Sequence, residues 1–371
     1  MIYLAFLYLE DGSIIAGKGF GARGVALGEL VFSTSMNGYP ESMTDPSYRG
    51  QILVFTHPLV GNYGVPKLRK NENVIINFES ESIQVRGIVV NELNSGYKYD
   101  KSKTLSKWMK EQNIAGIEVV DTRDIVSRIR EKGVLKAAIC NGVSVKEAAK
   151  KLQEFRYSGS DFISEVSTDR IKKYGKGDYN IMVFDFGIKH GIIRELLARN
   201  TRLVVVPYNF PAKDVLKIMP DGIVYTNGPG DPNKLHQSVI DMREVLASGI
   251  PVLGICLGHQ LIAKSFGGRI EKMKYGHRAI NKGVYDTLSK KAIITTHNHG
   301  YAVKKIPMNS KLWFYSLDDK TVEGLIYEKH NIITTQFHPE GGPGTNDGNY
   351  VFDRFMEMVK IWKAKKAMLK K

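Results

Sequence analysis

The sequence predicts an α/β protein of two domains, in which a mixed, strand-rich N-terminal domain precedes a doubly wound, mostly parallel sheet. Its 371 residues exceed one ordinary domain, and 43% of them are apolar, as in a protein with packed cores. Short strand-like runs broken by Gly, Pro and Asn fill the first part. From residue 180 onwards, continuous apolar strands alternate with helical patterns, which is typical of a parallel sheet covered by helices on both faces.

The N-terminal domain, expected over residues 1–150, is predicted from apolar runs and two helical patterns. The strand-like runs cover residues 1–7, 31–32, 52–55, 74–76 and 87–90. One helix is expected over 102–112, and a second follows Asp121-Thr122, a typical N-cap. The run at 1–7 ends at a turn and has neither a basic leader nor a small-residue cleavage site, which favours a strand over a signal peptide.

A polar stretch over residues 151–177 is predicted to be a linker, and the C-terminal domain is expected over 178–371. Its apolar strands cover residues 181–184, 203–206, 222–225 and 251–255. Helical patterns lie between these strands, as βαβ units require. After Gly268 the apolar runs shorten, which predicts an antiparallel extension, and a long helix from about Tyr350 closes the chain.

Cysteine usage and charge narrow the classes of function. Two cysteines, Cys140 and Cys256, are too few for a disulfide framework, which predicts a reduced, cytoplasmic compartment. No apolar run reaches the length that crosses a bilayer. The net charge of +15 invites a nucleic-acid-binding function, but the charges are spread along the chain, and the lysine-rich end fits a solvated helix. We expect no nucleic acid and no membrane as partner, whereas an acidic protein surface would suit the basic charge.

The sharpest local feature is the segment 254–260, Gly-Ile-Cys-Leu-Gly-His-Gln. An apolar strand stops at Ile255, Cys256 follows, and an apolar helix starts at once. Glycines two residues to either side permit the tight strand-to-helix turn of a nucleophile elbow, with sulfur in place of a hydroxyl. At a helix N-terminus, the helix dipole favours the thiolate. The alternative is a buried cysteine that ends a strand, and the flanking glycines favour the nucleophile.

A cysteine nucleophile needs a base that a third group orients. Among nine histidines, His338 is the best candidate, because its segment 336–340, Gln-Phe-His-Pro-Glu, directly follows the apolar strand 332–335. Pro339 ends the strand and rigidifies the turn. Glu340 stands two residues after His338 and is expected to hold the imidazole. The alternative interpretation of this His-Pro-Glu sequence is a surface turn with an incidental acid.

Two other histidine positions are weaker candidates. His297 and His299 form a His-x-His pair, but no third ligand stands at a useful spacing, so no metal site is expected. His259 lies inside the elbow helix and is expected to pack there or to support the site.

A glycine-containing loop over residues 226–232, Thr-Asn-Gly-Pro-Gly-Asp-Pro, follows another strand. Backbone N–H groups at Gly228 and Gly230 suit an oxyanion hole, although an ordinary turn before a helix would look the same. Gly19 to Gly24 fits G-x-G-x-x-G, but the next residues predict a strand and not the helix that a dinucleotide site requires. The sequence shows no nucleotide loop of its own, and no cofactor is expected in this chain.

Three motifs together, G-I-C-L-G-H-Q, N-G-P-G-D-P and F-H-P-E, resemble those of the class I (triad) glutamine amidotransferases. The rest of the chain narrows this resemblance to the small subunits of carbamoyl phosphate synthetases. The matching segments cover residues 29–41, 44–48, 61–64, 121–123, 185–189 and 298–301. The likeness spans essentially the whole chain, and no other amidotransferase class known to us carries that first domain.

The resemblance implies a role for each matching residue. Cys256 would form a γ-glutamyl thioester, His338 would be the acid and base, and Glu340 would orient it. Leu257 and a glycine of the 228–230 loop would supply oxyanion N–H groups. The residues that would bind glutamine are Ser47, Gly228, Gly230, Gln260, Asn298, Gly300 and Tyr301. Because Ser47 comes from the first domain, the pocket would lie at the domain interface.

The implied activity is hydrolysis of L-glutamine to glutamate and ammonia. The ammonia would pass through a tunnel to a separate large subunit that uses bicarbonate and ATP to make carbamoyl phosphate for arginine and pyrimidine biosynthesis. ATP and Mg²⁺ would belong to that subunit, in a heterodimer or a higher assembly. Three alternatives remain: an amidotransferase that serves a different synthase, a catalytically silent scaffold that docks and regulates a partner, and a nucleic-acid-binding protein.

Overall fold

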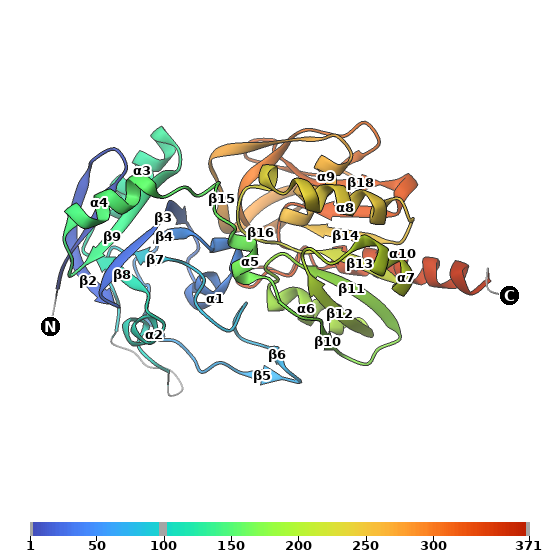
Figure 1. The fold of residues 1–371 in the computed structure, drawn as a ribbon, viewed down its shortest axis with the longest axis horizontal. Coiled ribbons are helices and arrows are strands. Elements are labelled where there is room, and N and C mark those ends of the chain that lie inside the picture. The colour runs from blue at the N-terminus through green and yellow to red at the C-terminus, as the bar shows by residue number, and fades with distance from the viewer. Residues whose placement is uncertain (1–2, 96–101, 369–371) are drawn as a thin grey trace. The chain divides into compact units, whose positions relative to one another are not determined.

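The computed structural model describes residues 3–95 and 102–368, and the chain divides into two compact units (Figure 1). The first unit comprises residues 1–69, 77–160 and 274–279, and the second comprises 70–76, 161–273 and 280–371. Met1 and Ile2 of the predicted first strand, and residues 369–371 of the lysine-rich end, lie outside the described residues. The predicted domain boundaries at residues 150 and 178 stay predictions. The stretch predicted as a linker contains regular elements, namely the end of α4 (Val145–Glu154), α5 (Phe162–Val166) and β10 (Lys172–Tyr174).

The first unit is built around a closed barrel with the strand order β1-β2-β8-β7-β4-β3-β9. Its strands are β1 (Tyr3–Leu9), β2 (Ile14–Gly21), β3 (Gly24–Ser33), β4 (Gln51–Phe55), β7 (Gly87–Val89), β8 (Ala115–Glu118) and β9 (Leu135–Asn141). Its remaining helices are α1 (Tyr39–Thr44), the 3-10 helix η1 (Pro46–Tyr48), α2 (Leu105–Glu111) and α3 (Thr122–Lys132). Parallel pairs join β3 to β4, β4 to β7 and β7 to β8, whereas β1 and β9 pair antiparallel. The mixed, strand-rich character predicted for this half is therefore confirmed.

The two faces of β9 show how the barrel is filled. Ala137 and Ile139 belong to the core cluster inside the barrel, whereas Ala138 and Cys140 pack with Ala148 of α4 on the outer face. This alternation follows from the period of two along a strand. Cys140 is fully buried, and burial raises the pKa of its thiol to about 11.

The second unit contains a sheet in the order β10-β12-β11-β13-β14-β19-β18-β17-β15-β16 (Figure 1). Its other strands are β11 (Tyr179–Asp185), β12 (Thr201–Pro207), β13 (Gly222–Tyr225), β14 (Val252–Ile255), β15 (Arg269–Asp286), β16 (Lys291–Lys305), β17 (Lys311–Ser316), β18 (Val322–Tyr327) and β19 (Ile332–Thr335), with the small pair β5 (Lys70–Asn71) and β6 (Val74–Ile75) apart from the sheet. Its other helices are α6 (His190–Leu197), α7 (Ala212–Ile218), η2 (Pro232–Lys234), α8 (His236–Leu246), α9 (Leu257–Ser265), η3 (Glu328–His330) and α10 (Tyr350–Met368). Five neighbouring strands of this sheet, β12, β11, β13, β14 and β19, are mutually parallel. β18 and β17 continue the sheet with antiparallel pairing.

Helices cover both faces of the parallel strands, as the alternation in the sequence predicted. Met182 and Phe184 of β11 pack with residues of α7, α8 and α9, and the intervening Ile181 and Val183 pack with residues of α6 and α10. The extension after residue 268 is antiparallel as predicted, but β15 and β16 are long, with 18 and 15 residues. Buried and exposed residues alternate along parts of both strands, so no continuous apolar run marks their length. In the described part of the chain, no helix combines the length and apolarity needed to cross a membrane.

Candidate active site

Cys256 occupies the turn between β14 and α9. Its φ angle is 53°, in the left-handed region that costs a non-glycine residue conformational energy. The Cys256 N–H donates to the carbonyl oxygen of Thr335 on β19 at 2.8 Å, so strand pairing continues up to this residue. The helix begins at the next residue, Leu257. The predicted nucleophile elbow is therefore present in the fold.

The two glycines that flank Cys256 are required by close contacts. A Cβ atom on Gly254 would lie 2.5 Å from Cδ1 of Ile262, and one on Gly258 would lie 2.2 Å from the carbonyl oxygen of Tyr225. The contact at Gly258 is with backbone, so a side chain there would push α9 away from β13. At Gly254 the end of the Ile262 side chain would have to move, and the backbone of Gly258 would lie 3.1 Å away. The glycines therefore provide space for the elbow.

The sulfur of Cys256 lies where three segments meet. It is 3.7 Å from the carbonyl oxygen of Asn298 on β16, and the side-chain amide of Gln336 donates to it at 3.6 Å. Gln260 of α9 donates to Oε1 of Gln336 at 3.0 Å and to the carbonyl oxygen of Tyr301 at 2.9 Å. Gln336 belongs to the predicted Gln-Phe-His-Pro-Glu segment, but it was not predicted to be a site residue.

His338 and Glu340 lie in the segment that follows β19 and form a buried pair. Nδ1 of His338 lies 2.7 Å from Oε1 of Glu340, and both side chains are inaccessible to solvent. Because a carboxylate only accepts hydrogen bonds, Nδ1 carries the proton of this contact. The second ring nitrogen, Nε2, is thereby left to exchange a proton with a nucleophile or a leaving group. The predicted base and its orienting acid are brought together.

Lys189 completes this group and was not predicted to be a site residue. Its ammonium lies 3.0 Å from Oε1 of Glu340 and donates to the carbonyl oxygen of Gly341 at 2.5 Å. Its side chain is 1% exposed, so its charge is compensated by these contacts and not by water. Residue 189 ends the matching segment 185–189, which was the one signal that pointed to it.

The charges of this group shift both pKa values strongly. Burial by itself would raise the pKa of Glu340, but Lys189 and His338 outweigh it and lower the pKa to about 2. Burial would likewise lower the pKa of His338, but Glu340 and the neighbouring Cys256 outweigh it and raise the pKa to about 10. The pair is thus an imidazolium and a carboxylate near neutral pH, and the ring holds a proton that it can donate.

The glycine loop lies against the elbow. The N–H of Gly258 donates to the carbonyl oxygen of Thr226 at 3.1 Å. A Cβ atom on Gly228 would lie 2.2 Å from the carbonyl oxygen of Phe186 and 3.0 Å from the side chain of Leu257. Leu257 is the first residue of α9, so its N–H has no carbonyl partner within the helix. The fold therefore brings together two of the residues predicted to form the oxyanion hole.

The other predicted substrate residues divide between the two units. Gly230 has a φ of 94° in the glycine loop, and Gly300 lies on β16 between Asn298 and Tyr301. Ser47 lies on η1 in the first unit, where its N–H donates to Oδ1 of Asp45 at 2.9 Å. Contact between Ser47 and glutamine stays a prediction, as do the glutamine-binding roles of the other residues.

Comparison with known proteins finds two family matches. Residues 7–139 match the carbamoyl-phosphate synthase small chain, CPSase domain, and residues 182–358 match the class-I glutamine amidotransferases. The chain is 49% identical to the carbamoyl phosphate synthase small chain of Sulfolobus acidocaldarius, over 95% of this chain and 96% of that relative. The chain belongs to the carbamoyl phosphate synthase small chain family.

Other members of the carbamoyl phosphate synthase small chain family are also similar to this chain over nearly its whole length. The protein from Sulfurisphaera tokodaii is 50% identical over 96% of this chain and 97% of its own length. The protein from Pyrococcus furiosus is 42% identical over 95% of this chain and 97% of its own length. The similarity covers both units, which confirms the family that the motifs indicated.

Proposed function

We propose that this chain is the glutamine-hydrolysing component of a carbamoyl phosphate synthetase and supplies ammonia to a large, ATP-dependent subunit. The observation that carries the proposal is the position of Cys256 at a strained elbow, close to the buried His338–Glu340 pair, in a member of the small-chain family. The carboxyl edge of a parallel sheet is where open α/β folds bind ligands.

The first half of the reaction forms a thioester. The sulfur of Cys256 attacks the side-chain amide carbon of glutamine as a thiolate. The imidazole of His338 holds the proton of the thiol while the C–S bond forms. The carbonyl oxygen becomes an oxyanion, which the N–H groups of Leu257 and of a glycine in the 228–230 loop stabilise. His338 then donates its proton to the departing nitrogen, the C–N bond breaks, and ammonia departs. A γ-glutamyl thioester remains on Cys256.

The second half of the reaction returns the enzyme to its starting state. Neutral His338 takes a proton from a water molecule as the water oxygen attacks the thioester carbon. The C–S bond breaks, glutamate leaves, and the proton taken from water stays with the Cys256–His338 pair. Glu340 holds the ring in one orientation throughout, and Lys189 keeps Glu340 ionised.

The partner of this chain follows from the fate of ammonia. In bulk water ammonia would be protonated and lose its nucleophilicity, so we propose direct transfer to the large subunit within a heterodimer or higher assembly. ATP and Mg²⁺ would be bound by that subunit, because the sequence of this chain has no phosphate-binding loop. We place the assembly in the cytoplasm, in arginine and pyrimidine biosynthesis.

The test is ammonia release from glutamine by the wild type and Cys256→Ser, each alone and with the co-expressed large subunit. We expect the rate to rise with the partner and to fall by at least about 10³-fold in Cys256→Ser, because the nucleophile is lost. Cys140→Ala is the matched control, since it removes the other thiol of the chain, in the first unit. An unchanged rate in Cys256→Ser would exclude the proposed mechanism.

The same preparations separate the alternatives. A silent scaffold would bind the partner but release no ammonia in any combination. An amidotransferase of another synthase would hydrolyse glutamine without stimulation by this large subunit. Retention on nucleic acid that weakens steeply with salt would support the nucleic-acid-binding alternative, and indifference to nucleic acid would remove it.

A further inference from the structure

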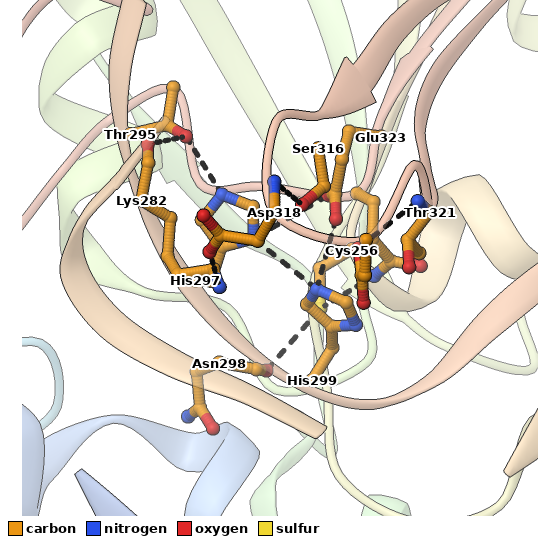
Figure 2. A network of polar contacts seen from close by, with 12 residues as sticks. Cys256, Lys282, Thr295, His297, Asn298, His299, Ser316, Asp318, Thr321 and Glu323 are labelled. Carbon is orange, nitrogen blue, oxygen red and sulfur yellow. Dashed lines mark hydrogen bonds and ion pairs between the residues drawn. The ribbon is translucent and has the colours of Figure 1, made fainter. Parts of the chain in front are cut away.

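A second histidine–carboxylate group lies in the second unit, on the antiparallel strands of the sheet. His297 and His299 project from β16, and Glu323 projects from β18. Their side chains are 0%, 1% and 0% exposed. Figure 2 shows the three side chains turned toward one another beside Asn298 and Cys256. The expectation of no metal site was based on the lack of a third ligand near the His-x-His pair in sequence, and the fold supplies Glu323.

The separations within this group are near those between the ligands of a small tetrahedral ion, since one possible ligand atom of each residue lies within 4.8 Å of the others. Nδ1 of His297 lies 3.3 Å from Nε2 of His299. Glu323 presents one oxygen 3.5 Å from Nδ1 of His297 and the other 3.7 Å from Nε2 of His299. Zinc binds imidazole nitrogen and carboxylate oxygen at about 2.0–2.2 Å, which puts neighbouring ligand atoms of a tetrahedron roughly 3.3–3.6 Å apart.

The outer nitrogen of His299 shows which ring nitrogen faces the group with a lone pair. Nδ1 of His299 lies 3.0 Å from the carbonyl oxygen of Tyr301, which only accepts hydrogen bonds. Nδ1 therefore carries a proton, and in the neutral ring Nε2 has the lone pair. Nε2 is the atom that faces His297 and Glu323.

The same reasoning applies to His297 through Thr295. The hydroxyl of Thr295 donates to the carbonyl oxygen of Lys282 at 3.1 Å, which uses its single proton. With the proton placed in that bond, the contact with Nε2 of His297 at 2.8 Å is one in which the ring donates. In the neutral ring the lone pair is on Nδ1, which faces His299 and Glu323 (Figure 2).

We propose that His297, His299 and Glu323 bind a divalent metal ion of the zinc type. Two imidazole nitrogens and a carboxylate converge at one buried point, where a cation would compensate the charge of the carboxylate. Two imidazoles and one carboxylate are a donor set that suits zinc and fill three of its four tetrahedral positions. The bonds from His299 to Tyr301 and from His297 to Thr295 are the outer hydrogen bonds that orient metal-binding imidazoles.

The ion would link β16 to β18 through its ligands, close to the nucleophile elbow. Asn298, between the two histidines, presents its carbonyl oxygen 3.7 Å from the sulfur of Cys256. The carbonyl oxygen of Tyr301 accepts from the ring of His299 and also from Gln260 of α9. Loss of the ion would therefore loosen the segment 298–301 while leaving Cys256 and His338 in place.

The first measurement is the metal content of the full chain, prepared without a polyhistidine tag. After a weak chelator has removed loosely held ions, we expect about one equivalent of zinc per chain. Cobalt added to the stripped protein should give the visible absorption of a tetrahedral site. The cobalt spectrum should be the same in Cys256→Ser, because the sulfur is not among the three ligands.

Substitutions of the ligands and of their hydrogen-bond partners should lower the affinity for zinc by different factors. Glu323→Gln and His297→Gln each remove a ligand and should weaken binding by more than about a hundredfold, beyond the 10–100-fold expected for Thr295→Val, which removes an outer hydrogen bond. His236→Gln, at an exposed position on α8, is the control and should bind zinc as the wild type does.

Two results would overturn the proposal. One is a wild type that holds no zinc after the weak chelator, which would leave a proton shared by the three groups as the cation. The other is zinc binding that survives in both Glu323→Gln and His297→Gln, which would place the ion elsewhere. If the ligand variants fail to fold, the zinc content and the cobalt spectrum of the wild type, compared with Thr295→Val, still decide between these outcomes.

Discussion

The two histidine–carboxylate groups of the second unit lie in different regions of one sheet. His338 and Glu340 follow the parallel strand β19, two residues apart, at the edge where Cys256 follows β14. In the other group, His297 and His299 come from one antiparallel strand and Glu323 from another. One group is therefore assembled by a single turn, and the other by the packing of separate strands.

The charges around the two carboxylates differ as well. Glu340 contacts one imidazole and the ammonium of Lys189, so its single histidine can gain and lose a proton while the carboxylate stays paired. Glu323 contacts two imidazoles whose lone pairs face the same point in the neutral rings. The comparison teaches that one ring per carboxylate suits acid–base catalysis, whereas two converging rings suit a bound cation.

The largest expected difference between the groups is in catalytic rate. His338→Asn should lower kcat for glutamine hydrolysis by roughly 10⁴-fold or more, because both proton transfers are lost. His297→Gln should lower kcat by no more than about tenfold, because its effect on the sulfur is indirect. Ammonia release under saturating glutamine measures both, and equal losses in the two variants would remove the distinction.

The two carboxylates should differ by a smaller factor. Glu340→Gln should lower kcat by roughly 10³–10⁴-fold, because an amide cannot stabilise the imidazolium. Glu323→Gln should act mainly on zinc retention, with any kinetic change seen mostly in KM for glutamine. Steady-state kinetics and metal content on the same preparations check this, and a KM effect confined to Glu340→Gln would contradict it.

The dependence of stability on pH should identify the His338–Glu340 pair as ionised. The lowered pKa of Glu340 stabilises the fold fully above 4.5, its ordinary value, and this stabilisation is lost as the pH falls through about 2. The raised pKa of His338 stabilises the fold fully below 6.5, and this stabilisation is lost as the pH rises through about 10. Both contributions are complete between pH 4.5 and 6.5.

The measurement is the free energy of unfolding in urea from about pH 2 to about pH 10. The wild type should exceed Glu340→Gln by about 3 kcal/mol between pH 4.5 and 6.5, since breaking a buried pair leaves an uncompensated charge. The difference should shrink toward either extreme of pH. A difference that does not vary with pH would show that the pair is not ionised in the folded protein.

The smallest expected effect concerns the elbow itself. Gly258→Ala should lower the free energy of unfolding by about 2–3 kcal/mol, because the new methyl group meets the carbonyl oxygen of Tyr225. Gly267→Ala is the comparison, because Gly267 has open space around it but a φ of 84°, and the substitution should cost only about 1 kcal/mol for that backbone conformation. Equal losses would mean that the close contact at Gly258 is relieved at little cost.

The parallel region was more predictable from sequence than the antiparallel one for a physical reason. Strands buried on both faces are continuous apolar runs, and the predicted catalytic residues stand just after them: Cys256 directly after β14, and His338 three residues after β19. Alternating exposure hid the length of β15 and β16. Closure of the first unit into a barrel depends on pairings between distant strands, which no local pattern records.

The missed site residues have the same explanation. Lys189 reaches Glu340 across 151 positions of the chain, and Glu323 reaches the His-x-His pair from another strand. Gln336 was visible in its motif, but its contact with sulfur depends on how β19 and α9 pack. Spacing along the sequence identifies side chains that lie in the same turn. Side chains that meet from distant parts of the chain are identified only by the fold.

The low reactivity expected of the Cys140 thiol would allow the concentration of active enzyme to be measured. The thiol is fully buried in the first unit and its pKa is raised to about 11, so at about pH 8 it is almost entirely protonated and unreactive toward haloacetamides. A haloacetamide carries the same primary amide as glutamine and should alkylate Cys256. The number of labels per chain would then give the fraction of active protein. This measurement distinguishes a variant with a lower kcat from a preparation that is partly inactive.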